Sequence, residues 1–188
     1  MGFFTFSTLR FKTMQLVATD GGSLKNGKPG CRASFAVVFG KDDPRNTSGE
    51  ITENPSNQSG EMTAITTAID IITDELESTE GGPKQTYTIL TDSDYGMKCF
   101  TTWASNWLRN DWKNAKGKPV SHKQLIAPAY KKYIKHQSKI KFKHIRSHRS
   151  PPTDKDSQAY QEWVFNDLAD KACAQILKMR GGASGSRQ

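Results

Sequence analysis

A helical pattern lies between two short β-rich runs, and this order limits the folds open to the chain. The runs are Met14–Thr19 and Thr86–Thr91. Between them, apolar residues recur at spacings of three and four, which predicts an amphipathic helix with Ser59 as its N-cap and Glu61 in its first turn. These apolar residues are Met62, Ile65, Ile69, Ile72 and Leu76. A right-handed crossover through this helix makes the two strands parallel neighbours in one sheet.

Three more strands and three more helices are expected. Strands at 31–40 and 49–53 follow the first strand through Gly, Asn and Pro turns, which predicts an antiparallel meander. A fifth strand is expected at 139–145, and helices at about 93–107, 121–136 and 161–178. We therefore expect an α/β fold with a mixed five-stranded sheet flanked by helices.

The length of 188 residues is typical of one domain, which we place at 14–180. Residues 1–13 are a leader or a flexible extension, with an extra strand or a cloning remnant as alternatives, and 181–188 form a flexible tail. No apolar stretch reaches the roughly 20 residues of a membrane span. Three cysteines without Cys-x-x-Cys spacing favour a reducing compartment. We expect an intracellular monomer, cytoplasmic or nuclear, with organelle targeting by 1–13 left open.

The positive charge of the chain is concentrated in one region. Residues 98–143 hold 12 lysines and arginines and a single acid, Asp111, so the net charge of this stretch is +11. The formal net charge of the whole chain is +8. The remaining residues therefore carry −3. A solvated helix face can also be basic, but this concentration favours a polyanionic partner such as nucleic acid.

Four acidic residues lie where predicted elements begin or end. Asp20 and Asp92 follow the two β-rich runs, while Glu61 and Asp170 fall on helices. Aspartates at the carboxyl ends of strands point into the crevice where open α/β sheets bind ligands. Gathered carboxylates repel one another, and a pair of divalent cations relieves this repulsion in enzymes that hydrolyse phosphodiesters. Each residue taken alone is also typical of a turn or a helix cap.

Asp94 and Asp167 compete for two of these roles. Asp170 lies one turn beyond Asn166 on the same helix face, whereas Asp167 is rotated away from Asn166 by about 100°. Asp94 falls in the first turn of a helix, where the dipole favours a carboxylate without any catalytic duty. We therefore select Asp92 and Asp170.

From about Met14 to Leu177, the chain resembles ribonuclease H of type 1. The resemblance rests on four short motifs in a fixed order: Thr19-Asp20-Gly21-Gly22, Asn57-Gln58 ahead of Glu61, Thr91-Asp92-Ser93, and Asn166 four residues before Asp170. The segment from Trp103 to Val120 is similar to the basic protrusion of cellular members. This resemblance implies the ribonuclease H fold and endonucleolytic cleavage of the RNA strand of RNA/DNA hybrids.

The resemblance also implies a metal site and a proton-transfer residue. Asp20, Glu61, Asp92 and Asp170 would hold two Mg²⁺ ions, or Mn²⁺, to give 5′-phosphate and 3′-hydroxyl ends. His148 matches a loop histidine that assists proton transfer and product departure, although the loop after it is longer than in the family. His144, on an alternating strand, is expected to be structural.

Several residues match positions that contact nucleic acid in the family. Amides and a hydroxyl would reach the minor groove: Asn26, Ser56, Asn57 and Gln58. Aromatic and basic residues would grip the DNA strand: Trp103, Trp107, Trp112, Lys113, Lys116 and Lys118. Asn54 and His122 replace an arginine and an asparagine that are common in the family, which weakens the expected phosphate pocket. The alternatives are amides in ordinary turns and tryptophans in the core.

Two other functions fit the same pattern. A junction resolvase or a transposase-like strand transferase would use the same carboxylates on duplex DNA. A binding protein without turnover would use the basic region alone.

Overall fold

The computed structural model describes residues 14–78, 85–147 and 149–179. Its centre is a five-stranded sheet in the order β3-β2-β1-β4-β5. β1 pairs antiparallel with β2 and parallel with β4, and β5 extends the parallel part. The mixed five-stranded sheet is therefore confirmed. The strands are β1 Met14–Leu24, β2 Arg32–Val38, β3 Thr47–Ile51, β4 Thr86–Thr91 and β5 Ile140–His144.

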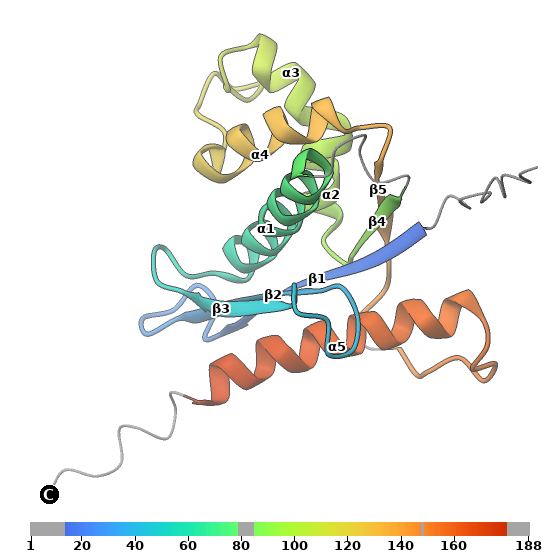
Figure 1. The fold of residues 1–188 in the computed structure, drawn as a ribbon. Coiled ribbons are helices and arrows are strands. Elements are labelled where there is room, and N and C mark those ends of the chain that lie inside the picture. The colour runs from blue at the N-terminus through green and yellow to red at the C-terminus, as the bar shows by residue number, and fades with distance from the viewer. Residues whose placement is uncertain (1–13, 79–84, 148, 180–188) are drawn as a thin grey trace, which may run out of the picture.

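Helices cover both faces of the sheet (Figure 1). α1 (Asn57–Ser78) packs on one face with α4 (Lys123–Lys135) beside it, and α5 (Gln158–Met179) crosses the other face. The larger apolar cluster lies under α1, where Met62, Ile65 and Ile69 are fully buried. A smaller cluster lies under α5, around Leu90, Ala169 and Cys173. Within the described residues, no helix is long and apolar enough to cross a membrane.

β1 is longer than the apolar pattern predicts. We expected it to end at Thr19, but it continues to Leu24 because the polar segment after Asp20 pairs with β2, from Asp20↔Ala36 to Leu24↔Arg32. Asp20 is therefore inside the strand. The parallel pairing with β4 stops at Ala18↔Leu90, so Asp20 still lies just beyond the end of the parallel part of the sheet.

The helix expected at 93–107 is interrupted by a π-helix. The structure has α2 at Asp94–Lys98, a π-helix at Cys99–Trp103 and α3 at Ala104–Arg109. A π-helical turn accommodates one extra residue, and here it allows the adjacent Cys99 and Phe100 both to be buried. α4 starts two residues later than predicted because His122 has a φ of +58°, in the left-handed region that L-residues rarely extend into a helix.

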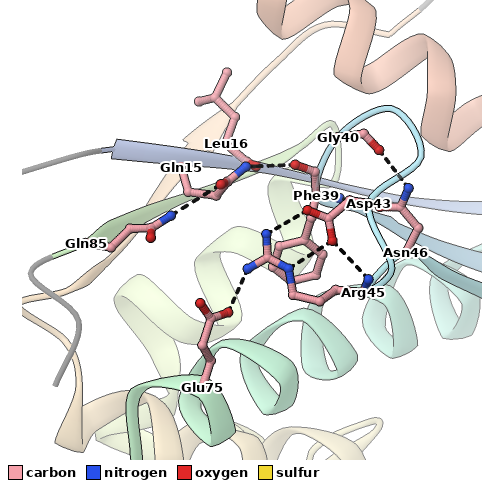
Figure 2. Close-up of polar contacts among 9 residues, drawn as sticks. All are labelled: Gln15, Leu16, Phe39, Gly40, Asp43, Arg45, Asn46, Glu75 and Gln85. Carbon is pink, nitrogen blue, oxygen red and sulfur yellow. Dashed lines mark hydrogen bonds and ion pairs between the residues drawn. The ribbon is translucent and has the colours of Figure 1, made fainter. Parts of the chain in front are cut away.

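The connection between β2 and β3 is tied to α1 through Arg45 (Figure 2). The Arg45 guanidinium donates to Asp43 at 2.7 and 2.9 Å and to Glu75 of α1 at 2.7 Å. It also lies over the Phe39 ring, 4.3 Å from the centroid. Hydrogen bonds from Arg45 hold the pKa of the Asp43 carboxyl below its usual value. This network anchors the connection between β2 and β3 to α1.

Candidate functional site

Asp20 and Asp92 lie at the same end of two adjacent parallel strands. Each is two residues beyond the last parallel pair, Ala18↔Leu90. The Thr19 hydroxyl donates to the Leu90 carbonyl at 3.1 Å and ties the two strands together next to both aspartates. His144 Nε2 donates to the Asp92 backbone carbonyl at 3.0 Å, which fixes the segment after β4 against β5.

Glu61 reaches this end of the sheet because α1 touches β1 at glycines. A Cβ atom on Gly21 would lie 2.0 Å from the backbone nitrogen of Glu61, and one on Gly60 would lie 2.4 Å from the Ser34 carbonyl. Only residues without side chains allow this approach of two backbones. The Asn57 amide donates to Glu61 Oε1 at 2.7 Å and orients the carboxylate.

The start of α1 differs from the prediction. Ser59 is not the N-cap but lies inside the helix, and Ser56 takes the capping position. The Ser56 hydroxyl accepts from the Ser59 amide at 3.0 Å, while the Ser59 hydroxyl accepts from the Ser56 amide at 2.9 Å, a reciprocal arrangement like a capping box. Glu61 therefore falls in the second turn of α1 and not in the first.

Asp170 reaches the cluster because α5 is attached to β1 one turn further along. The Cys173 thiol donates to the Asp20 backbone carbonyl at 3.3 Å, and the Ser34 hydroxyl donates to the Cys173 carbonyl at 3.1 Å. Asp170 is exposed and precedes Cys173 by three residues, on the same side of the helix. Cys173 was missed in the sequence; its spacing from Asp170 was the available signal.

The two competing aspartates have other partners. Asp94 is bridged to Lys98 at 2.6 Å, and Asp167 to Lys171 at 2.6 Å, both across one helical turn. In each pair the lysine neutralises the carboxylate. These contacts favour the choice of Asp92 and Asp170.

The acidic residues interact electrostatically. Burial raises the pKa of Asp20 to about 6, and the charges of Asp92 and Asp170 add to the increase against the lowering effect of hydrogen bonds from Cys173 and Gly21. Burial and the charge of Asp92 also raise the pKa of Glu61, although hydrogen bonds from Ser93 and Asn57 oppose them. The cluster thus contains negative charge that nearby cationic side chains do not offset.

The carboxylates are near one another without forming a complete ligand set. Among the described residues, no group of three or more His, Cys, Asp or Glu side chains is arranged to hold a metal ion. The donors are nevertheless all carboxylate oxygens, the ligands that Mg²⁺ and Mn²⁺ prefer. Their mutual repulsion is what a bound cation would relieve, so the residues fit such an ion.

The proton-transfer residue proposed from the sequence, His148, lies outside the described residues. The amides expected to reach the minor groove lie around the start of α1. Asn26 Oδ1 accepts from the backbone N–H of Asn57 at 3.1 Å, so the loop after β1 joins the residue whose side chain orients Glu61. Gln58 is exposed, whereas the Ser56 hydroxyl is engaged in the helix cap. Of these residues, Asn57 thus contacts Glu61 directly, and Asn26 is joined to Asn57.

The three tryptophans of the basic region divide into one core residue and two partly buried ones. Only 7% of Trp112 is exposed and it belongs to the main core, which leaves little of its ring for the expected contact with nucleic acid. Trp103 and Trp107 also pack against this core while remaining partly exposed, with ring centroids 5.7 Å apart. A sequence pattern of three tryptophans and several lysines cannot tell which ring turns inward.

The basic region is partly neutralised by α1. Lys132 of α4 lies 2.9 Å from Asp70 and 3.4 Å from Asp74, and His136 lies 3.1 Å from Glu77. Lys116 and Lys118 are exposed in the loop between α3 and α4, where their backbone amides donate to Asn114 Oδ1. Lys113 is also exposed, 3.8 Å from Asp111. In the described part of the chain, no carboxylate lies within ion-pair distance of Lys116 or Lys118, so this loop offers free positive charge.

His122 stands at the end of the same loop. Burial lowers the pKa of its imidazole, so the ring is neutral near pH 7. Its Nδ1 is buried and has no hydrogen-bond partner among the described residues. This histidine therefore offers no positive charge to a phosphate in the free protein.

Comparisons with known proteins agree with this geometry. The sequence pattern of the RNase H family matches residues 12–175. A ribonuclease H of Schizosaccharomyces pombe is 42% identical over 113 residues, which are 60% of this chain and 39% of that protein. The chain thus spans well under half of this relative's length.

Solved structures share the fold at lower identity. The RNase H domain of prototype foamy virus has a TM-score of 0.62 and 22% identity, covering 88% of this chain and 94% of that one. A foamy viral protease-reverse transcriptase in complex with an RNA/DNA hybrid has a TM-score of 0.61 and 18% identity, covering 88% of this chain and 20% of that one. At these identities the similarity concerns the fold.

Proposed function

Because the chain belongs to the RNase H family, we propose that it is a metal-dependent endonuclease that hydrolyses the RNA strand of RNA/DNA hybrids. The observation that carries the proposal is a buried carboxylate among other carboxylates: burial raises the pKa of Asp20 to about 6, and the charges of Asp92 and Asp170 add to the increase. Carboxylates that are held close together despite their mutual repulsion are typical of a site for a cation-dependent reaction. The complex of the foamy viral enzyme with a hybrid supports the choice of substrate.

The proposed cofactors are two Mg²⁺ ions, with Mn²⁺ as an alternative. When bound, they supply positive charge that activates the attacking water and stabilises the departing 3′ oxygen, leaving 5′-phosphate and 3′-hydroxyl ends. The four carboxylates hold this charge in place, and Asn57 keeps Glu61 oriented through its 2.7 Å hydrogen bond. His148 is proposed to carry a proton to or from the reacting strand.

Substrate recognition is proposed to use two surfaces. Asn57 contacts Glu61, Asn26 is bonded to Asn57, and Gln58 is the next residue of α1. Their amides can read the 2′-hydroxyl of the RNA strand, which both donates and accepts. Lys113, Lys116 and Lys118 can hold phosphates of the DNA strand from the loop between α3 and α4, beside the partly exposed Trp103 and Trp107. These two surfaces would place the RNA strand at the carboxylates.

We further propose that the protein acts as an intracellular monomer, in the cytoplasm or the nucleus. Three free cysteines, Cys31, Cys99 and Cys173, support a reducing compartment. The alternative is targeting to an organelle by residues 1–13. Imaging of the tagged chain with and without these residues distinguishes the two locations.

The proposal is tested by incubating the protein with an RNA/DNA hybrid, duplex DNA and a four-way junction, each in Mg²⁺ and in EDTA. We expect the RNA strand of the hybrid to be cut in Mg²⁺ only, with 3′-hydroxyl fragments. Cleavage of duplex DNA or of the junction in place of the hybrid would make the chain another nuclease on this scaffold. Salt-sensitive hybrid binding without any fragments would make it a binding protein.

A further inference from the structure

A cavity of about 540 Å³ lies between β5, the loop that follows it and the first half of α5. This volume is within the range of about 300–1,000 Å³ that is typical of small-molecule pockets. The proposed hydrolysis makes no use of it. Its lining includes the polar or aromatic residues Lys143, His144, Arg146, Arg149, Glu162 and Trp163.

The cavity carries net positive charge. Among the described residues that line it, Glu162 is the single acid, and its Oε1 accepts from Lys143 at 2.5 Å and from Gln158 at 2.9 Å. Lys143 therefore cancels the charge of Glu162. Arg146 and Arg149 are exposed, and neither is within ion-pair distance of a carboxylate in the described part of the chain. Two guanidinium groups thus remain available to an anion.

An aromatic ring stands beside these charges. Trp163 Nε1 donates to the Arg149 backbone carbonyl at 2.8 Å, which fixes the indole next to the arginine. The Trp163 and Tyr160 rings have centroids 5.9 Å apart at an angle of 31°. A held aromatic ring next to free cations is the combination that binds unpaired nucleotides, through stacking of the base and contact with the phosphate.

The cavity leads to the acidic cluster. A second cavity of about 320 Å³ shares Arg149, Ser150, Trp163 and Asn166 with the first, and Asp167 and Asp170 complete its lining. A strand that passes Asp170 can therefore place a neighbouring nucleotide beside Trp163. A base-paired nucleotide cannot do so, because its base is held in the duplex.

We propose that this cavity binds one unpaired nucleotide of the RNA strand, with the base against Trp163 and the phosphate at Arg146 and Arg149. The inference rests on the proposed function, because the RNA strand is taken to be the one that passes Asp170. It gives the protein a preference for hybrids whose RNA strand extends beyond the DNA as a single strand.

The test compares affinities in EDTA, where no strand is cut. Fluorescence anisotropy gives Kd for a blunt hybrid, for the same hybrid with two unpaired RNA nucleotides at either end, and for one with two unpaired DNA nucleotides. We expect an RNA extension at one end to tighten binding by at least about fivefold, the equivalent of ~1 kcal/mol for one stacked base. Trp163→Ala should remove this gain and leave the affinity for the blunt hybrid unchanged.

Two further variants control the measurement. Trp163→Phe keeps an aromatic ring and should retain part of the gain, while Lys155→Ala, an exposed residue of the same loop outside the cavity lining, should retain all of it. Equal affinities of the parent for blunt and extended hybrids, an equal gain from a DNA extension, or a full gain in Trp163→Ala would overturn the inference. If blunt hybrids are still cut in Mg²⁺, the proposed function survives any of these results.

Discussion

A Cβ atom on Gly21 would lie 2.0 Å from the backbone nitrogen of Glu61, so β1 and α1 meet backbone to backbone beside the acidic cluster. This contact brings a helix residue into the same small region as Asp20, which follows Thr19 on the strand. The geometry of the cluster thus depends on a residue that carries no functional group.

Gly21→Ala is expected to disturb the site and the fold together. The added methyl group overlaps the α1 backbone, which cannot move as a flexible side chain would, so we expect a loss of about 3 kcal/mol or more in the free energy of unfolding. Urea denaturation measures this loss. Gly27→Ala is the matched control: nothing lies within 4 Å of a Cβ there, and its φ of +71° costs about 1–2 kcal/mol. Equal stability losses in the two variants would contradict the close contact.

Burial of Asp20 and the nearby charges of Asp92 and Asp170 make the stability of the metal-free protein depend on pH. The pKa of this carboxyl is about 6 in the folded protein, against its ordinary value of 3.8. Between these pH values the folded state holds a proton that the unfolded state has lost. The contribution of the Asp20 proton to the free energy of unfolding is therefore complete below pH 3.8 and is lost as the pH rises through 6. The difference is ~3 kcal/mol at about 1.4 kcal/mol per pKa unit.

Asp20→Asn removes this dependence. In EDTA, we expect the variant to match the parent near pH 4 and to exceed it by up to ~3 kcal/mol at pH 7.5, as measured by urea denaturation at each pH. If the difference in unfolding free energy between Asp20→Asn and the parent does not change with pH, the pKa of the Asp20 carboxyl is not raised in the folded protein.

The loop between α3 and α4 is expected to bind phosphates without supporting the fold. Lys116 and Lys118 are exposed, so alanine at either position should leave the free energy of unfolding within about 0.5 kcal/mol of the parent. Each change should weaken hybrid binding and reduce the slope of log K against log salt by about 1. Lys41→Ala, exposed on the connection between β2 and β3, is the control and should leave the slope unchanged.

Trp112, in contrast, is expected to support the fold. The residue is 7% exposed and belongs to the main core, so Trp112→Ala should cost about 3–5 kcal/mol of unfolding free energy. Trp112→Phe, which keeps most of the apolar surface, should lose less and bind the hybrid as the parent does. Weaker hybrid binding by a stably folded Trp112→Phe would show that the Trp112 ring contacts the nucleic acid.

The sequence predicted the sheet and the strand neighbours well because they follow from local patterns. Alternation and helical spacing mark elements, and the crossover rule makes β1 and β4 parallel, which brings Asp20 near Asp92. Element ends were less predictable. The polar segment after Asp20 has no apolar pattern, yet it pairs with β2, and the π-helix at Cys99–Trp103 depends on burial of two adjacent residues.

The parts of the site that the sequence left unseen depend on contacts between distant residues. The Cys173 thiol of α5 donates a hydrogen bond to the backbone carbonyl of Asp20 in β1, and the Trp163 indole donates one to the backbone carbonyl of Arg149 in the loop before α5. Neither side chain belongs to one of the four motifs. The spacing of Cys173 from Asp170 was the one signal in the sequence, and the contacts themselves depend on the packing of α5 against its neighbours. Burial likewise separates Trp112 from Trp103 and Trp107, which local spacing treats alike.

The most direct test of the central claim is the rate at which Asp92→Asn cuts an RNA/DNA hybrid in Mg²⁺, relative to Asp94→Asn. The two residues are separated by one position, but Asp92 is coupled to Asp20 and Glu61, whereas Asp94 is exposed and bridged to Lys98. We predict a loss of about a thousandfold for Asp92→Asn, ~4 kcal/mol of transition-state stabilisation, and almost none for Asp94→Asn. Cleavage by Asp92→Asn at the parent rate would contradict the account.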